Sequence, residues 1–188
     1  GMPSISDPGK ELVAACVHAD IPVVPLPGAN AGITALIASG LSPQPFTFYG
    51  FLERKHQQQV RQLKQLQAHR ETMIFYEAPH RLKKTLKTMA EVLGMERRVV
   101  LARELTKRYE EFIRGSLAEA IEWADTNQVR GEFVILVAGN DQPIEQSQEH
   151  PQGTPIEQVD QEVANGLSTN AAIKLVAKRL GIKRQEMY

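Results

Sequence analysis

The sequence predicts an α/β fold in which a mixed sheet is flanked by helices, followed by a small all-helical appendage at the C-terminal end. Short apolar runs alternate with segments whose apolar residues recur every three or four positions, which is typical of layered α/β domains. Residues 141–155 are rich in Gln, Glu and Pro with almost no large apolar side chain, which indicates a linker. Two further amphipathic segments follow this linker.

Composition excludes several classes of protein. The 188 residues include 22 Lys and Arg and 22 Asp and Glu, so strong net charge neither keeps this chain unfolded nor clamps it onto nucleic acid. A single cysteine, Cys16, cannot form an internal disulfide, and nothing near it has zinc-site spacing. No apolar run approaches the ~18 residues of a membrane helix, and no signal peptide is recognisable. We therefore expect a cytoplasmic protein that binds neither membrane nor metal.

The N-terminal residues predict a helix followed by a strand. Asp7 is a good N-cap, and Pro8 suits the first helical position, where its missing N–H costs nothing. Apolar residues then repeat on one helical face at Leu12, Val13, Cys16 and Val17. The apolar run 21–26 predicts a strand. The chain thus begins inside a β-α-β pattern, and we expect its first strands to be absent.

A glycine turn follows that strand and leads into a helix of small apolar residues at 31–39, which Gly40 ends. A strand, a glycine turn and a helix N-terminus in succession can form a ligand cradle, because backbone N–H groups point outward and little side-chain bulk blocks approach. A plain β-to-α turn has the same pattern, and the residues alone leave both readings open.

The next elements follow from local signals. Strands are predicted at 46–51, 72–76, 98–102, 109–113 and 132–138 from their apolar and aromatic runs. Helices are predicted at 53–68, 79–93 and 116–125, and two short ones at 156–164 and 168–180, with a third beginning at Lys183. Pro79 suits a first helical position, Gly94 ends that helix, and Ser116 and Glu119 have the spacing of a capping box.

Charge is unevenly distributed along the chain. Residues 51–114 contain 15 Lys and Arg against eight Asp and Glu. Residues 141–165 contain six acids and no base, and residues 166–188 contain five bases and one acid. Two basic segments therefore flank an acidic linker. They are either solvated helix surface or a footprint for a phosphate backbone.

Charged residues gather where predicted strands end. Glu77, His80 and Arg81 lie at the carboxyl end of the strand 72–76, the place where open α/β sheets bind ligands. A cation is unfavourable at a helix N-terminus, so we expect Arg81 to have a specific anionic partner, either a protein carboxylate or a phosphate. Alternatively, Glu77 and Arg81 form an ordinary i,i+4 pair and His80 is a surface residue.

A second charge cluster ends the strand 98–102, with Arg103, Glu104 and Lys107. A third, 130–132, precedes the last strand and contains a glycine that permits a tight turn or a close backbone approach. Charged strand ends of one sheet can converge on one cleft. The alternative is a network of loop salt bridges without function.

Five segments in this order resemble the tetrapyrrole methylase superfamily. They are Gly1–Gly9, Pro22–Ala31, Phe75–Arg81, Ala102–Lys107 and Arg130–Val134. The third and fourth separate this branch from the corrin and porphyrin methylases, and they resemble the bacterial branch that methylates a cytidine 2′-hydroxyl in small-subunit (16S) ribosomal RNA. The resemblance implies S-adenosylmethionine as cofactor, held between two α/β domains, usually in a homodimer.

The resemblance also implies a division of the chain. Residues 1–26 would be a remnant of the N-terminal domain, 27–140 the C-terminal α/β domain with the methyltransferase fold, 141–155 a linker, and 156–188 an incomplete tail resembling a helix-turn-helix. An early Pro- and Gly-containing loop that helps hold the cofactor in the family is missing, so we expect the chain alone to be inactive.

The resemblance and the basic segments together assign residues to roles. Catalytic roles fall to Glu77, Arg81, Glu104 and Lys107; cofactor binding to Pro27, Gly28, Ala29, Asn30, Ala31, Tyr76 and Arg103; and RNA binding to His80, Arg81, Lys107, Lys174, Lys178 and Arg179. Asn30 stands where the family commonly has Ser. Two alternatives remain: a corrin or porphyrin C-methyltransferase, which shares fold and cofactor, and a non-enzymatic RNA-binding module that uses only the basic tail.

Overall fold

The computed structural model describes residues 2–141, 155–164 and 168–180. The chain divides into two compact units, Gly1–Pro143 and Ile144–Tyr188, which are described separately. Within the described residues no helix is both long enough and apolar enough to cross a membrane.

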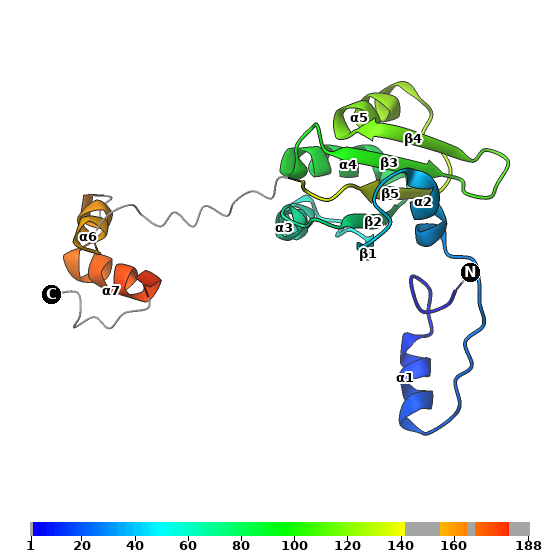
Figure 1. Cartoon of the computed structure of the whole chain (residues 1–188), viewed down its shortest axis with the longest axis horizontal. Coiled ribbons are helices and arrows are strands. Elements are labelled where there is room, and N and C mark those ends of the chain that lie inside the picture. Colours follow the sequence, from blue (N-terminus) through cyan, green and yellow to red (C-terminus); the bar gives the residue numbers. More distant parts are fainter. Residues whose placement is uncertain (1, 142–154, 165–167, 181–188) are drawn as a thin grey trace. The chain divides into compact units, whose positions relative to one another are not determined.

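The first unit is built on a five-stranded sheet with the order β1-β2-β5-β3-β4 (Figure 1). The strands are β1 (Phe46–Phe51), β2 (Thr72–Glu77), β3 (Arg98–Arg103), β4 (Glu111–Ser116) and β5 (Phe133–Val137). β1 and β2 are parallel, whereas β5 is antiparallel to both β2 and β3, and β3 is antiparallel to β4. The predicted mixed sheet is confirmed, and its last strand in sequence lies at its centre.

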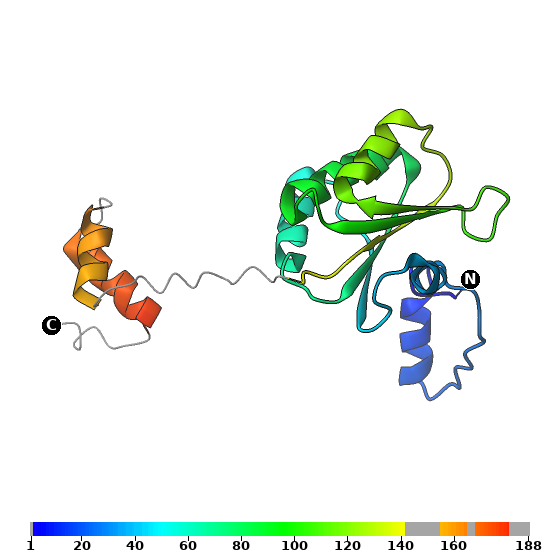
Figure 2. The same cartoon turned by 45° about the horizontal axis from the view of Figure 1, so that its top comes forward.

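Helices cover the two faces of this sheet unequally (Figures 1 and 2). They are α2 (Ala31–Ser39), α3 (His56–Leu66), α4 (Pro79–Leu93) and α5 (Leu117–Thr126). Side chains alternate between faces along each strand, so Phe75 and Ile135 pack with α3, α4 and α5, while Ile74 and Leu136 pack with α2. One face thus carries three helices and the other carries one.

Most helix ends form where their local signals predict them. The Asn30 side chain caps α2 by accepting a hydrogen bond from the Ile33 N–H, and Gly40 ends this helix in the left-handed conformation. Ser116 and Glu119 form the predicted capping box of α5. Pro79 opens α4 and Gly94 ends it. The predicted helix ends at Gly40, Pro79, Gly94 and the Ser116–Glu119 box are confirmed, and the cap formed by Asn30 is an addition to them.

Several strand and helix boundaries differ from the prediction by one to three residues, and distant contacts set two of them. β4 begins at Glu111 instead of residue 109, because its ladder with β3 starts where Glu111 lies opposite Arg103. α3 begins at His56 instead of residue 53, because the guanidinium of Arg81 binds the carbonyl oxygens of Leu52 and Glu53 and keeps that segment extended into a loop. Neither contact is visible in the local sequence.

The N-terminal prediction is partly wrong. The helix α1 spans Lys10–His18, with Gly9 instead of Asp7 at its N-cap, and none of its residues is buried. The predicted strand 21–26 is absent, and Val24 and Leu26 are 77% and 79% exposed. No strand in residues 2–141 pairs with this segment, and an apolar run becomes a strand only beside a hydrogen-bonding neighbour.

The second unit contains α6 (Pro155–Ala164) and α7 (Thr169–Leu180), as predicted. Val159 of α6 packs with Ala172, Ile173 and Val176 of α7 in a small apolar cluster. The turn expected at 165–167, the linker at 142–154 and the segment from residue 181 lie outside the described residues.

Candidate functional site

Two of the predicted charge clusters meet at one edge of the sheet. Because β5 runs antiparallel to both its neighbours, its first residue, Phe133, lies opposite the last residues of β2 and β3, which are Glu77 and Arg103. The segment 130–132, which leads into β5, therefore joins the same edge. The charged strand ends lie at one edge of the sheet as expected, but they do not converge on one cleft, because Glu77 and Glu132 line one cavity whereas Arg103 and Glu104 line another.

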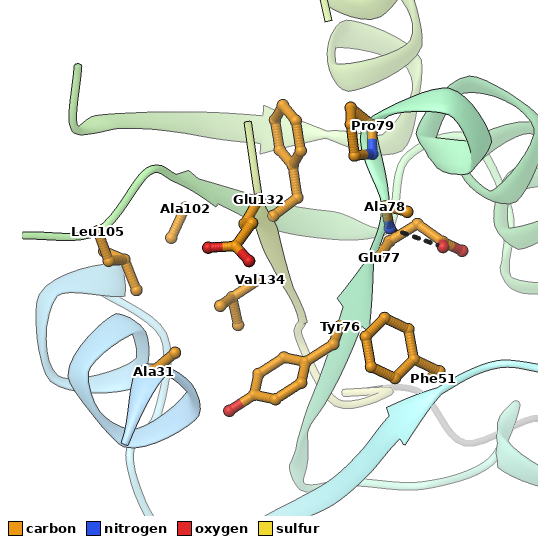
Figure 3. A pocket seen from close by; sticks show the side chains of 11 residues that line it. Ala31, Phe51, Tyr76, Glu77, Ala78, Pro79, Ala102, Leu105, Glu132 and Val134 are labelled. Carbon is orange, nitrogen blue, oxygen red and sulfur yellow. Dashed lines mark hydrogen bonds between the residues drawn. The ribbon is translucent and has the colours of Figure 1, made fainter. Parts of the chain in front are cut away.

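A cavity of about 420 Å³ opens at this edge, beside the first turn of α2 (Figure 3). It is lined by Ala31, Phe51, Tyr76, Glu77, Ala78, Pro79, Ala102, Leu105, Glu132, Phe133 and Val134. Its walls are mainly apolar, and its size is that of cavities that hold small molecules and cofactors. The cavity lies on the sheet face that carries a single helix.

Tyr76 joins α2 to the sheet within this cavity. Its hydroxyl accepts a hydrogen bond from the Gly32 N–H at 3.1 Å, and its ring lies edge-on to Phe48 and Phe51. A Cβ on Gly32 would lie 3.4 Å from both Ile74 and Phe48, so the first turn of α2 packs tightly on the sheet. These contacts hold the aromatic wall of the cavity in one place.

Glu77 lines the cavity, but its carboxylate is committed elsewhere. The side chain is buried, its Oε2 accepts a 2.6 Å hydrogen bond from Thr85, and its Oε1 accepts from the Ala78 N–H at 2.9 Å. Thr85 in turn accepts from the amide of Gln59. Figure 3 shows the carboxylate directed away from Glu132. Glu77 thus ties α4 to β2 and α3.

The anionic partner expected for Arg81 is a protein carboxylate. Its Nε lies 3.4 Å from Oε1 of Glu77, and its Nη2 donates to the carbonyl oxygens of Leu52 and Glu53 at 3.1 and 3.2 Å. The guanidinium therefore joins the start of α4 to the loop after β1. Of the two partners that the sequence allowed, the structure contains the carboxylate.

The loop after β3 is held against the segment before β5 by a charged cluster. Oε1 of Glu104 accepts from Nζ of Lys107 at 3.0 Å and from the Glu132 N–H at 2.9 Å. Lys107 also donates to Oε2 of Glu132 at 2.8 Å. The Glu132 backbone N–H and then Lys107 lower the pKa of Glu104, and hydrogen bonds to Glu132 and Glu104 raise the pKa of Lys107.

Gly131 is required by this arrangement. Its φ is +86°, and a Cβ at this position would lie 2.4 Å from Cγ of Glu104. Glu104 itself has a left-handed φ of +49°, which its hydrogen bonds maintain. The close backbone approach expected at this glycine is confirmed.

The remaining predicted residues are distributed around the cavity. Of residues 27–31, only Ala31 lines it, whereas Asn30 is occupied as the cap of α2. Arg103 points into a neighbouring hollow, where it binds Glu111 and the carbonyl oxygen of Arg130. His80 is exposed beside Arg81 in an adjacent groove.

The RNA-binding residues predicted in the tail lie on α7. Lys174 is exposed, whereas the side chains of Lys178 and Arg179 lie outside the described part of the chain. Among the described residues no group of three or more His, Cys, Asp or Glu side chains could hold a metal ion.

Sequence reasoning missed Phe51, Leu105 and Val134 as lining residues. Phe51 carried a signal, because it is the last residue of an aromatic strand and sits beside a charged segment. Leu105 and Val134 carried none, since each reaches the cavity only through the pairing of β5 between β2 and β3.

Comparison of the chain with known proteins agrees with its fold. The model of the tetrapyrrole (corrin/porphyrin) methylases matches residues 1–121. The chain is 49% identical over 190 residues to ribosomal RNA small subunit methyltransferase I of Bacillus subtilis, an alignment that covers all of this chain and 65% of that protein. The chain thus spans about 65% of the length of this relative.

Solved structures show the same fold at lower identity. The methyltransferase CobJ superposes with a TM-score of 0.56 and 21% identity, covering 74% of this chain and 62% of that one. Uroporphyrin-III C-methyltransferase of Thermus thermophilus, in complex with S-adenosylhomocysteine, superposes with a TM-score of 0.52 and 17% identity, covering 73% and 62%.

Proposed function

The chain belongs to the tetrapyrrole methylase family, and on this premise we propose that it is part of an S-adenosylmethionine-dependent enzyme that methylates the 2′-hydroxyl of a cytidine in small-subunit ribosomal RNA. The observation that carries the proposal is the 49% identity, over all of this chain, to a protein named as a small-subunit ribosomal RNA methyltransferase. The apolar cavity at the sheet edge supports it, since a methyl transfer needs a dry site that aligns two reactants.

The cavity suits S-adenosylmethionine by its chemistry. Tyr76 and Val134 offer an aromatic and apolar wall for an adenosyl group, and the carboxylate of Glu132 suits a cationic ligand. Ala31 supplies backbone at that wall. The family resemblance assigns the residues that precede it, Pro27, Gly28, Ala29 and Asn30, to the cofactor as well. When bound, the cofactor supplies an electrophilic methyl group on a sulfonium.

The four residues assigned to catalysis act in two pairs. Glu77 and Arg81 position the start of α4 and the loop after β1, because both side chains are committed to protein groups. Glu104 and Lys107 hold the loop after β3, which carries Leu105, against the segment before β5, which carries Glu132. A general base works best with a pKa near neutrality, and the pKa of Glu104 is lowered instead. We therefore assign both glutamates to positioning.

Arg103 does not line the cavity, so in this proposal it acts on the cofactor site indirectly. It binds Glu111 of β4 and the carbonyl oxygen of Arg130, so it braces the loop that leads to Glu132. We further propose that the enzyme is a cytoplasmic homodimer, as the family resemblance implies, and light scattering of the purified protein measures that state.

Two measurements test the proposal. Calorimetric titration of S-adenosylmethionine into the protein should give binding that Tyr76→Ala weakens, with Tyr109→Ala, an exposed tyrosine outside the cavity, as control. Labelled methyl transfer to unmethylated small ribosomal subunits by the full-length protein, followed by nucleoside analysis, should yield 2′-O-methylcytidine. Methylation of a precorrin or porphyrin instead would contradict the proposal.

A further inference from the structure

A groove of about 820 Å³ runs beside the cavity and shares two of its lining residues, Phe51 and Ala78. It lies between the loop after β1 and the first turns of α4. Whatever occupies the groove can therefore extend into the cavity without leaving the protein surface.

The groove is strongly basic. Arg54, Lys55 and Lys84 line it with exposed side chains, for which no hydrogen bond or ion pair is present within the described residues. The lysines on the neighbouring face of α4, Lys83 and Lys87, both pair with Asp125. Lysines paired with a carboxylate thus lie on one side of α4, and cations without such a pair among the described residues lie on the side that lines the groove.

The wall that carries Arg54 and Lys55 is fixed in shape. Arg81 binds the carbonyl oxygens of Leu52 and Glu53, and the Glu53 N–H donates to the side chain of Gln62 at 3.2 Å. Arg81 is itself held by buried Glu77. The cations are therefore presented by a braced loop, which reduces the entropy that a ligand loses on binding.

Phe51 stands where the groove meets the cavity. Its side chain is 54% exposed, and its ring lies 5.8 Å, centroid to centroid, from the ring of Tyr76. Exposed aromatic rings next to cations are the combination on which single-stranded nucleic acids bind, because bases stack on the ring while phosphates bind the cations. An anionic membrane or acidic protein surface requires the cations but no stacking ring.

We propose that this groove binds the single-stranded RNA that flanks the target nucleotide, with phosphates on Arg54, Lys55 and Lys84 and a base stacked on Phe51. The inference rests on the proposed function and deepens it, because it names the path by which the strand reaches the cavity. Phe51 then orients the strand, and the cations supply affinity without reading its sequence.

The charges are tested with two double variants that each remove two exposed cations. Arg54→Gln with Lys55→Gln alters the groove, while Arg61→Gln with Lys64→Gln alters α3 outside it. Affinity for a fluorescein-labelled single-stranded RNA is measured by anisotropy over a range of salt. The groove variant should lower the slope of log K against log salt by about 1.4, and the control should not.

The role of the Phe51 ring is tested with the variant Phe51→Leu. Its control is Phe46→Leu, which alters another exposed phenylalanine at the opposite end of β1. Phe51→Leu should weaken RNA binding by about fivefold or more, since a stacked base contributes at least that factor. The loss should disappear with an abasic oligonucleotide, because no base is then present to stack. Phe46→Leu should leave the affinity unchanged.

Equal RNA affinity and equal salt slope in the two double variants would overturn the proposal. It would also be overturned if the groove variant lost binding to phosphatidylserine vesicles but kept its RNA binding. The cofactor affinity of every variant is measured by calorimetry. If the groove variants bind S-adenosylmethionine normally and also bind RNA as tightly as the unaltered protein, only the proposal that the groove binds RNA is refuted. Absence of cofactor binding in the unaltered full-length protein refutes the proposed function instead.

Discussion

Glu104 and Glu132 are joined by two reciprocal hydrogen bonds: the Glu104 N–H donates to the Glu132 carbonyl oxygen at 3.0 Å, and the Glu132 N–H donates to Oε1 of Glu104 at 2.9 Å. This pair connects the loop after β3 to the start of β5. Leu105 and Glu132, which line the cavity, are therefore held in place by one side chain.

The first prediction concerns pH. Because the pKa of Glu104 is lowered in the folded protein, its ionised form stabilises the fold above the ordinary glutamate pKa of about 4.3, and this stability is lost as pH falls through the lower folded value. Glu104→Gln should lower the urea midpoint at neutral pH, and the difference from the unaltered protein should shrink as the pH falls below the ordinary glutamate pKa. Exposed Glu122→Gln should show no such difference.

The second prediction compares two glycines with left-handed backbone. Gly131→Ala should cost more than Gly40→Ala, because a Cβ at Gly131 displaces the Glu104 side chain, whereas a Cβ at Gly40 meets nothing within 4 Å. Gly40→Ala should lose about 1–2 kcal/mol from its φ alone. Urea unfolding measures both, and equal losses would show that the contact with Glu104 contributes nothing.

The third prediction concerns the buried carboxylate. Glu77→Ala should lower the free energy of unfolding by about 3 kcal/mol, because it leaves Arg81 and Thr85 without their acceptor. Glu91→Ala breaks a surface pair between Glu91 of α4 and His56 of α3 and should cost less than about 1 kcal/mol. If Glu77→Ala unfolds like Glu91→Ala but loses methyl transfer, Glu77 acts in the reaction itself.

The fourth prediction concerns the second unit. Deletion of residues 156–188 should weaken binding to ribosomal RNA and reduce its salt dependence, because this segment carries Lys174 and four further bases. Cofactor affinity should be unchanged, since every residue that lines the cavity lies before residue 135. Unchanged RNA affinity and salt slope after deletion would assign the helices to a structural role.

Local signals predicted the parts of the fold that depend on neighbouring residues. Gly40 and the Ser116–Glu119 box cap helices through contacts within one turn, so the sequence reveals them, whereas the cap that Asn30 forms on α2 was not predicted. The run at 21–26 has an equally clear strand signal, yet it forms no strand, because the pairing partner of a strand is not encoded locally.

The site was predicted less completely for the same reason. Its charges stood out at strand ends, but their roles depend on which group each meets in space. Arg81 meets Glu77, and Lys107 bridges two glutamates. Phe51 reaches the cavity only because β1 pairs beside β2. Spacing along the chain identifies such residues as candidates, and tertiary pairing decides what they do.

The central position of β5 has a consequence for the order in which the unit is made. Until residues 133–137 leave the ribosomal exit tunnel, the nascent chain holds a β1–β2 pair and a β3–β4 hairpin with no strand to join them. The edges of β2 and β3 stay unpaired during this interval, so the unfinished sheet is open to intermolecular strand pairing. Because β5 joins β2 to β3 and supplies Phe133 and Val134 to the lining, the cavity is complete only once this strand is in place.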